Sequence, residues 1–406
     1  MPPLPFPEPR WEGLPAPDPA DVARLERALS LPRAVCALLA ARGLTDAERA
    51  KAFLRPRLEA RVQPRTLADA VPAVERLLRA IEGDETVLVH GDYDVDGMAG
   101  TVLLTRWLRR VGARRVIPFA PHRMRHGYDF GPGGLERARE VGASLVVTVD
   151  CGVRALDTVR RARSEGIDVI VTDHHAPGPE LPDALAVVNP NRPDCPYPDG
   201  GLAGAGVAYR LCELLAEARG VGADELHADL DLVALATVAD LVPLEGENRT
   251  LVRYGLRALE RTEKPGLRAL LAVAGVSGSV DAGQVGFRLA PRLNAIGRMG
   301  DPADGLALLL AEDEREARAL AERADQLNRR RQDEERRTLD QVLDRLADGA
   351  YDPARDFGVV VAGEGWHPGV IGIVASRVVE RIYRPTVLVA LDGAGGGRGS
   401  ARSVAG

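Results

Sequence analysis

Residues 86–97 read TVLVHGDYDVDG, and this stretch decides the fold. Its opening TVLVH is a short apolar run with the length and valine content of a buried strand. Three aspartates follow at alternate positions, and a glycine then permits the turn into an amphipathic helical pattern near 98–111. Because a strand followed at once by a helix is half of a βαβ unit, the stretch predicts a parallel sheet.

The alternation of apolar strand and amphipathic helix continues along the chain. Runs rich in valine and isoleucine predict strands at 86–90, 115–119, 144–150 and 168–172. Further helical patterns near 133–141 and 154–165 lie between them. The predicted fold class is therefore α/β, with a parallel sheet whose strands end at one common edge.

The regions on either side of this sheet are mainly helical. A proline-rich opening predicts an extended arm to about residue 19, followed by helices at 20–31, 46–54 and 68–82. Helical sequence runs from about 202 to 275, and the charged segment 312–345 predicts one long connecting helix. A smaller α/β unit follows, with strands near 356–362 and 386–391 around a helix at 368–381.

We divide the chain into four parts on this basis. They are an N-terminal arm with helices (1–67), a parallel-sheet domain with a helical subregion (68–275), a substrate-binding segment with the connecting helix (276–349), and a smaller, incomplete α/β domain (350–406). A length of 406 residues agrees with two or three domains of about 150 residues each.

The composition excludes some classes of protein. A net charge of −6 argues against contact with nucleic acid or anionic membrane over the whole surface, although a local basic cleft stays possible. The spacing of the four cysteines fits neither a zinc knuckle nor a disulfide framework and favours a reducing compartment. With no signal-peptide pattern and no apolar run of about 18 residues, we expect a cytoplasmic protein that does not enter a membrane.

Each motif at the carboxyl edge of the predicted sheet carries residues that can bind a metal. They are His90, Asp92, Asp94 and Asp96 after the first strand, Asp150 at the end of the third, Asp173-His174-His175 after the fourth, and Asp240 in the apolar helix 230–242. Each motif alone has a simpler explanation. The three aspartates could form a calcium loop, Asp150 could cap a helix, the two histidines could be surface residues, and Asp240 could bond to a neighbouring group. Convergence from four elements favours a shared metal site, because an unpaired carboxylate in an apolar helix is costly.

The mixture of ligand types indicates the metal and the reaction. Carboxylates with imidazoles suit Mn²⁺ or Mg²⁺ better than structural zinc, which prefers cysteine and histidine. Two such ions about 4 Å apart, bridged by an aspartate, would activate a water and stabilise the leaving oxygen of an attack on phosphorus. We therefore expect two divalent ions and hydrolysis of a phosphoester or phosphoanhydride.

These motifs resemble those of the DHH phosphoesterase superfamily, which is named after the tripeptide Asp173-His174-His175. Within it, the chain is similar to the RecJ family of 5′→3′ exonucleases specific for single-stranded DNA. The similarity runs from about residue 68 to residue 403. It rests on HGDYDVDG, VTVDCG, VTDHH, VVNPN, LAGAGVAY, ATVADLVPL, APRLNAIGRMGDP and GEGWHPGVIGIVASR, in this order.

The resemblance implies a role for each matching residue. The implied metal ligands are His90, Asp94, Asp96, Asp150, His174 and Asp240, with Asp150 bridging. The implied catalytic residues are Asp92, as a ligand or outer-shell base, and His175, contacting metal or scissile phosphate. The implied strand contacts are Arg123, Tyr128, Arg292, Asn294, Arg298, His367, Ser400 and Arg402. The glycine-rich stretch 395–403 predicts either a nest of N–H groups around a phosphate or a flexible loop.

The chain departs from the family pattern in three places. Asp129 follows Tyr128 where the family usually has glycine, and Ala401 replaces another customary glycine. The chain also ends at Gly406, within the family's DHHA1 domain and before its OB-fold. We therefore expect a truncated chain.

Two other functions stay open. A DHH/DHHA1 phosphodiesterase of short oligonucleotides or cyclic dinucleotides shares the ligands but lacks APRLNAIGR and the long helix; a family pyrophosphatase fits less well for the same reasons. A Cdc45-like replication scaffold keeps the fold after losing the ligands, which are all present here. The resemblance favours an exonuclease of recombination and repair, acting as a monomer on a single strand with a 5′ end. It implies a single-strand-binding protein and a RecQ-type helicase as partners.

Overall fold

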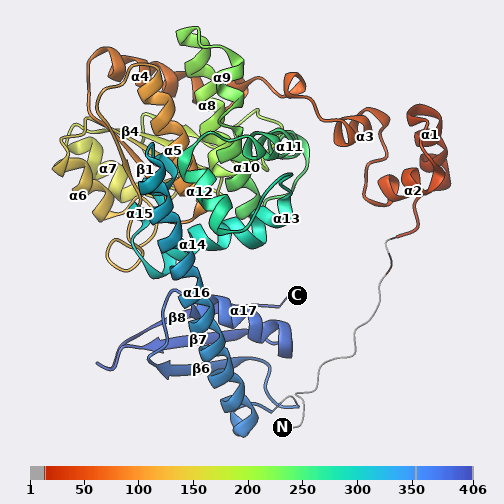
Figure 1. The fold of residues 1–406 in the computed structure, drawn as a ribbon, viewed down its shortest axis with the longest axis vertical. Helices are drawn as coiled ribbons and strands as arrows, with labels where there is room; N and C mark the ends of the chain where they lie inside the picture. Colours follow the sequence, from red (N-terminus) through yellow and green to blue (C-terminus); the bar gives the residue numbers. More distant parts are fainter. Residues whose placement is uncertain (1–12, 14, 353, 405–406) are drawn as a thin grey trace. The chain divides into compact units, whose positions relative to one another are not determined.

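The computed structural model describes residues 13, 15–352 and 354–404, and the chain divides into two compact units (Figure 1). The larger unit extends to Ala324, and the smaller begins at Asp325. Most of the predicted N-terminal arm lies outside the described residues, and those described before Pro19 form no helix or strand.

A five-stranded parallel sheet forms the centre of the larger unit. Its strands are β1 (Val87–Gly91), β2 (Val116–Phe119), β3 (Leu145–Val149), β4 (Asp168–Thr172) and β5 (Ala186–Val188). They are ordered β2-β1-β3-β4-β5 and every pair is parallel, which confirms the predicted fold class. Because β1, β3 and β4 are adjacent, the loops that follow them meet at the carboxyl edge.

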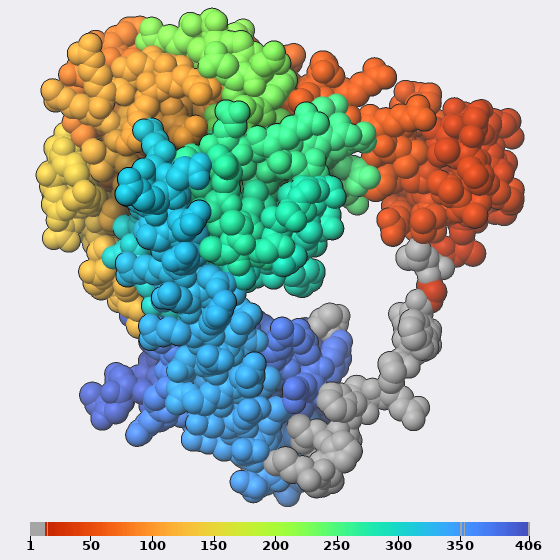
Figure 2. Space-filling view, in the orientation of Figure 1, coloured from red at the N-terminus to blue at the C-terminus, as the bar shows by residue number. Residues whose placement is uncertain are grey.

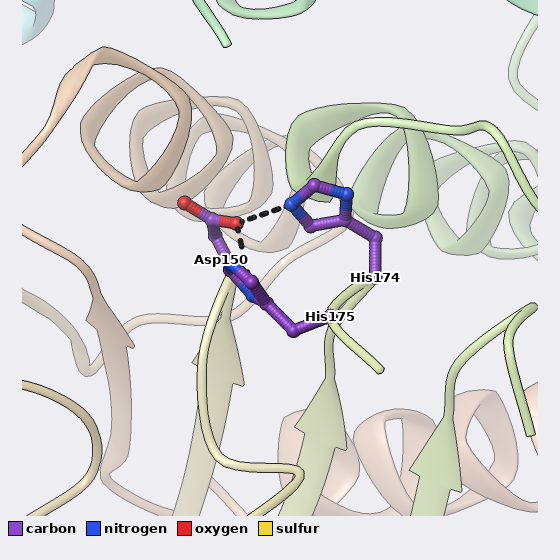
Figure 3. A group of neighbouring side chains, drawn as sticks. All are labelled: Asp150, His174 and His175. Atoms are coloured by element: carbon purple, nitrogen blue, oxygen red, sulfur yellow. Dashed lines mark ion pairs between the residues drawn. The ribbon is translucent and has the colours of Figure 1, made fainter. Parts of the chain in front are cut away.

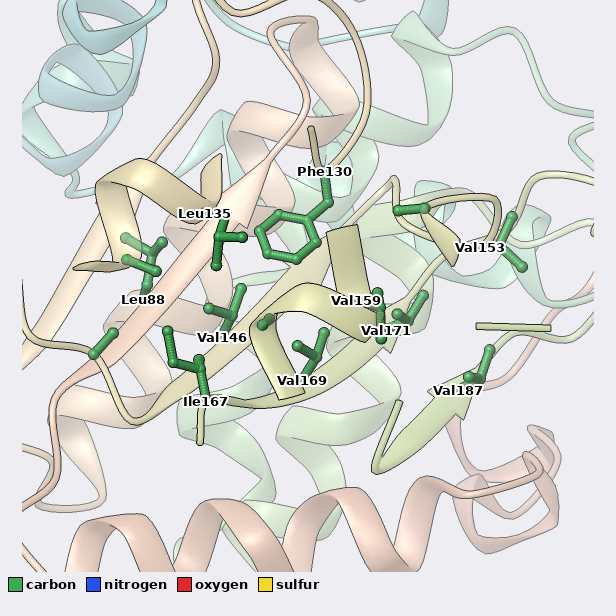
Figure 4. Close-up of a cluster of buried hydrophobic side chains, with 14 residues drawn as sticks. Leu88, Phe130, Leu135, Val146, Val153, Val159, Ile167, Val169, Val171 and Val187 are labelled. Atoms are coloured by element: carbon green, nitrogen blue, oxygen red, sulfur yellow. The ribbon is translucent and has the colours of Figure 1, made fainter. Parts of the chain in front are cut away.

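Helices cover both faces of this sheet. They are α4 (Ala70–Glu82), α5 (Val95–Arg110), α6 (Pro132–Glu140), α7 (Leu156–Ser164) and α8 (Gly204–Arg219). On one face, Leu135 of α6 and Val159 of α7 pack with Leu88, Val146 and Val169 of the strands (Figure 4). On the other, α4, α5 and α8 contact the strands. Burial from both sides explains why the runs in β1 and β3 are mostly apolar, with His90 and Thr148 as their polar residues.

The remaining helices of the larger unit lie before and after the sheet. They are α1 (Pro19–Leu29), α2 (Arg33–Ala41), α3 (Ala47–Leu54), α9 (Ala223–His227), α10 (Leu230–Ala239), α11 (Gly246–Glu260), α12 (Pro265–Val273), α13 (Ala282–Gln284), α14 (Ala290–Met299) and α15 (Pro302–Leu310). A π-helical turn, Val285–Leu289, leads into α14. On the face drawn in Figure 2, the helical segments that follow the sheet are coloured green to teal. Among the residues described, no helix has the length and apolar character needed to cross a membrane.

The predicted long helix is α16 (Glu314–Arg345), which begins in the larger unit and ends in the smaller one. It is followed by the π-helical turn Leu346–Ala350. The smaller unit then contains β6 (Val359–Glu364), α17 (Ile371–Ile382), β7 (Thr386–Leu391) and β8 (Gly397–Arg402). Strand β7 pairs in parallel with β6 and antiparallel with β8.

The interpretation of 395–403 as a nest or flexible loop is wrong, because residues 397–402 form strand β8. A tight turn before it positions the strand: Oδ1 of Asp392 accepts the N–H groups of Ala394 at 2.9 Å and of Gly396 at 3.0 Å. Glycine disfavours a strand by itself, so pairing with β7 decides the local structure.

Candidate metal centre

The carboxyl edge of the sheet and the end of α10 bring together aspartates and histidines from four elements. Within the described residues, three groups have ligand atoms that all lie within 4.8 Å of one another. The groups are Asp150 with His174 and His175, Asp96 with His174 and Asp240, and Asp92 with Asp94 and Asp150. Because Asp150 and His174 each belong to two groups, the three form one continuous cluster.

The loop after β1 is fixed by hydrogen bonds at the starts of two helices. Asp94 is the N-cap of α5, and its Oδ1 accepts the N–H of Gly97 at 3.0 Å. Asp96 accepts the N–H of Gly204 at 2.6 Å and that of Ala205 at 2.7 Å, one on each carboxylate oxygen. These two donors are at the N-terminus of α8, so that helix holds a buried ligand in place.

Asp150 lies at the centre of the cluster, directly after β3. Its backbone is left-handed, with φ of +64°, and its side chain is buried. Burial, and then the charges of Asp96 and Asp94, raise its pKa well above the ordinary value. Its Oδ1 lies 3.1 Å from Nε2 of His174 and 3.9 Å from Nδ1 of His175 (Figure 3).

The Asp173-His174-His175 loop after β4 combines ligands with their support. Oδ1 of Asp173 lies 2.8 Å from Nδ1 of His175 and accepts the N–H of His174 at 2.7 Å. The hydrogen bond with Asp173 raises the pKa of His175 to about 9. The amide of Asn189 donates to the carbonyl of His175 at 2.9 Å, and that of Asn191 to the carbonyl of His174 at 2.5 Å. The VVNPN motif therefore supports the ligand loop.

Asp240 completes the cluster from the end of α10. The prediction that it lies inside a helix over 230–242 is wrong, because α10 ends at Ala239 and Asp240 caps it. Leu241 then takes a left-handed φ of +61°, which turns the chain away. The side chain of Asp240 is 24% exposed, and its Oδ2 lies 3.7 Å from Nε2 of His174. Burial and then the charge of Asp94 raise its pKa to about 6.

His90 lies outside the three groups. It is fully buried in β1, where its ring meets Phe130 at 5.2 Å and its Nδ1 lies 3.6 Å from Sγ of Cys151. Burial lowers the pKa of His90 to about 4, so the ring is neutral near neutral pH. Its buried Nε2 has no hydrogen-bond partner within the described chain. This nitrogen packs against α6, because a Cβ at Gly134 would lie 2.6 Å from it, so the part of His90 in the metal centre stays a proposal.

The cluster fits divalent cations. Oδ1 of Asp150 and Nε2 of His174 are buried and 3.1 Å apart, yet neither forms a hydrogen bond of good geometry with any described residue. Burial lowers the pKa of His174, which keeps its ring neutral and its lone pair available. A buried carboxylate without a hydrogen-bond partner becomes favourable once a cation neutralises its charge. A neutral imidazole can offer its lone pair to the same cation. The oxygen and nitrogen ligands suit Mn²⁺ or Mg²⁺.

Two residues predicted to bind the DNA strand lie beside the HGDYDVDG motif, called the first motif below. Arg123 and Tyr128 are in the loop between β2 and α6, and both meet Tyr93. The guanidinium carbon of Arg123 is 5.3 Å from the Tyr93 ring centre, and the Tyr128 ring centre is 6.2 Å from it. Tyr128 is 52% exposed, so much of its ring is free to contact a ligand.

Arg292, Asn294 and Arg298 lie on α14. Gly297 brings this helix close to the first motif, because a Cβ at Gly297 would lie 2.1 Å from the carbonyl oxygen of Tyr93. Burial raises the pKa of Tyr93, and the charges of Arg123 and Arg298 oppose this rise, which places Arg298 near the site. The side chain of Arg292 turns back toward the π-helical turn before α14 and donates to the carbonyl of Arg288 at 2.5 Å.

The other predicted strand contacts belong to the smaller unit. Arg402 and Ser400 are on β8, and Nη1 of Arg402 donates to Oγ of Ser400 at 3.2 Å. His367 precedes α17, and its Nδ1 accepts the N–H of Gly369 at 3.0 Å. These three residues form contacts within their own unit.

Sequence reasoning missed several residues at the site. It listed Asp173 only among the residues that can bind a metal, whereas here its carboxylate also holds His174 and His175, and it assigned no role to the N-terminus of α8. It also missed the exposed side chain of Leu241, which directly follows Asp240 and is 85% exposed. The glycines of LAGAG could have indicated a close contact at the start of α8. Only glycine fits at position 204, because a Cβ there would lie 2.6 Å from Cβ of Asp150. Exposed apolar side chains have no such signal.

Comparisons with known proteins agree with this geometry. Residues 86–237 match the model of the DHH family, N-terminal domain. The chain is 40% identical over 399 residues to the single-stranded-DNA-specific exonuclease RecJ of Bacillus subtilis (strain 168). This alignment covers 98% of the chain and 49% of the relative, so the chain spans about half of that relative's length.

Two solved structures are similar to this one. An exonuclease RecJ bound to manganese shares 39% identity, with a TM-score of 0.75 and coverage of 84% of this chain and 83% of that one. RecJ from Thermus thermophilus in complex with Mg²⁺ shares 34% identity, with a TM-score of 0.74 and coverage of 96% and 52%. Sequence identity over most of a RecJ structure, together with the DHH-family match, shows that the chain belongs to the RecJ family of DHH phosphoesterases.

Proposed function

We propose that the chain is a single-stranded-DNA-specific exonuclease that hydrolyses phosphodiesters from the 5′ end and releases 5′-mononucleotides, in recombination and repair. The observation that carries the proposal is the cluster in which Asp150 and His174 each belong to two ligand groups. Membership of the RecJ family selects single-stranded DNA among possible phosphoesters, because the B. subtilis relative is an exonuclease specific for it.

The proposed cofactors are two divalent ions, Mn²⁺ or Mg²⁺. We assign them to His90, Asp94, Asp96, Asp150, His174 and Asp240. The place of Asp150 in two of the three ligand groups supports its assignment as the bridging ligand. When bound, such a pair supplies an activated water and neutralises charge on the leaving oxygen.

Asp92 and His175 are the proposed catalytic residues. Burial and then the charge of Asp94 raise the pKa of Asp92, which makes its carboxylate a stronger base toward the attacking water. His175 uses Nδ1 for its bond with Asp173, and its pKa of about 9 keeps the ring protonated at neutral pH. Its Nε2–H is therefore suited to donate to an oxygen of the scissile phosphate.

The proposed strand contacts combine cations with aromatic rings. The group of Arg123, Tyr93 and Tyr128 offers a guanidinium for a phosphate and an exposed ring for a base. Arg292, Asn294 and Arg298 on α14 are further proposed contacts. In the smaller unit, His367, Ser400 and Arg402 complete the set, with Arg402 and Ser400 as ligands of the 5′ phosphate.

The proposal extends to the setting in which the protein works. We assign it a cytoplasmic location, a monomeric state, and association with a single-strand-binding protein and a RecQ-type helicase. These partners would supply single strands, which the proposed reaction consumes.

Hydrolysis rates on four substrates test the proposal. With Mn²⁺ present, we expect rapid hydrolysis of a long single strand, slow hydrolysis of a dinucleotide or cyclic dinucleotide, and no hydrolysis of a blunt duplex. Preference for a dinucleotide would instead indicate an oligonucleotide phosphodiesterase. Failure to bind Mn²⁺ in a calorimetric titration would indicate a non-catalytic scaffold.

A further inference from the structure

Asp129 occupies a backbone conformation that suits glycine. Its φ is +71°, in the left-handed region that costs a residue with a Cβ about 1–2 kcal/mol. It lies between Tyr128, which is 52% exposed, and Phe130, which is 1% exposed. The residue thus stands where the loop of Arg123 and Tyr128 passes into the core.

The carboxylate of Asp129 joins this loop to the one that carries Asp150. Its Oδ1 accepts the N–H of Phe130 at 2.8 Å and the N–H of Gly152 at 2.6 Å. Gly152 is two residues after Asp150 and has a φ of +105°, a conformation that favours glycine. A Cβ at Gly152 would lie 2.6 Å from Oγ1 of Thr148, which leaves no room for another residue.

Both loops are otherwise anchored separately. On one side, Oγ1 of Thr148 donates to the carbonyl of Cys151 at 2.7 Å. On the other, the ring of Phe130 is packed in the core and meets His90 at 5.2 Å. The bond from Gly152 to Asp129 directly links the chain around Tyr128 to the chain around Asp150.

We propose that Asp129 is a positioning residue that ties the loop of residues 121–128, which is proposed to contact the DNA, to the loop that carries Asp150. The DNA strand would then be held at a fixed position relative to the metal centre. This inference rests on the proposed function for its effect on catalysis. The hydrogen bond itself stands independently of that function. The left-handed backbone of Asp129 is strained, and the two hydrogen bonds that its carboxylate accepts offset that strain.

Three substitutions separate the tether from the backbone conformation. D129G suits the φ of +71° but lacks the acceptor. D129N keeps an oxygen acceptor and tolerates left-handed φ. D129A lacks the acceptor and keeps the strain. A matched control is D84G, because Asp84 is also left-handed, with φ of +49°, and lies before β1 at the opposite edge of the sheet.

Amide hydrogen exchange and steady-state kinetics on a 5′-phosphorylated single strand form the test. We expect faster exchange at Gly152 in D129G and D129A, and parent-like exchange in D129N. We expect kcat/KM to fall about tenfold in D129G, through a raised KM and a lowered kcat. Its melting temperature should stay close to that of the parent, because relief of the left-handed strain offsets the lost hydrogen bonds. D129N should recover most of this loss, and D84G should behave like the parent.

The outcomes distinguish this inference from the proposed function. Parent-like exchange at Gly152 and parent-like kinetics in D129G would overturn the tether, as would a D129N protein as impaired as D129G. An inactive parent would contradict the proposed function, while the exchange rates at Gly152 would still decide whether the tether exists.

Discussion

At the scale of single residues, the molecule concentrates negative charge where a cation has to bind. Burial raises the pKa of Asp92, Asp96 and Asp150, and neighbouring carboxylates raise it further. These residues are buried, and the charged form of each is costly without a cation. The cluster therefore lowers the stability of the metal-free fold, and the binding of divalent ions would relieve this cost.

The substitution Asp150→Asn tests this opposition between stability and metal binding. The folded pKa of Asp150 lies above its unfolded value of about 3.9, so the folded state holds more protons and its stability falls as pH rises above about 4. For Asp240 the same loss of stability occurs between about pH 4 and its folded pKa of about 6. Removing the Asp150 charge should raise the melting temperature of the metal-free protein by about 2–4 °C at neutral pH.

The same variant should lose its response to metal. Thermal melts with and without Mn²⁺ should show a large shift for the parent and a small one for D150N, and turnover should fall at least about a thousandfold. A D150N protein that is less stable than the parent in chelator, or that keeps its turnover, would contradict the assignment of Asp150.

At the scale of elements, α8 shapes the site with its N-terminus. Two of its N–H groups bind Asp96, and its first glycine packs against Asp150. A Cβ at Gly204 would lie 2.6 Å from Cβ of Asp150, whereas a Cβ at Gly206 would lie 3.5 Å from its nearest neighbour, Leu202. The helix can therefore approach the metal centre only through the first of these two glycines.

A matched pair of alanine substitutions in α8 checks this approach. G204A should displace Asp150 and lower kcat by about a hundredfold or more, since small shifts of a catalytic group are costly. G206A should keep parent-like turnover and be as stable or more stable by up to about 1 kcal/mol, because alanine favours a helix. Equal activity in the two variants, measured with Mn²⁺ on single-stranded DNA, would contradict the claim that α8 positions Asp150 through Gly204.

The sequence predicts elements whose signal is local and misses those that depend on distant partners. Strands β1, β3 and β4 are mostly apolar runs, so their shared edge and the clustering of Asp150 with His174 follow from the pattern. Strand β8 has a glycine-rich sequence and forms by pairing with β7. Likewise, the contact of Gly204 with Asp96 joins residues far apart in the chain, and no periodicity shows it.

At the scale of the whole molecule, an acidic chain is proposed to bind a polyanion. The net charge is −6, and part of the negative charge lies in the metal centre, where divalent ions would neutralise it. The arginines proposed to contact the strand are few, and Arg123 stands beside aromatic rings near the first motif. Binding should therefore rest on a few local contacts and on stacking.

The salt dependence of binding measures how many contacts are made. For three to four arginine contacts, the logarithm of the binding constant should fall with that of the salt concentration with a slope of about −2 to −3. R123A should make this slope shallower by about 0.7. R160A should leave it unchanged, because Arg160 pairs with Asp157 on α7. A slope that R123A does not change would exclude Arg123 from the phosphate contacts.

The most direct test of the central claim is the product pattern from one single strand labelled at either end. With Mn²⁺, the 5′-labelled strand should release labelled mononucleotide from the earliest times. The 3′-labelled strand should give a ladder that shortens progressively. Labelled mononucleotide appearing first from the 3′-labelled strand, or an equally active Asp150→Ala protein, would contradict a 5′→3′ exonuclease built on this metal centre.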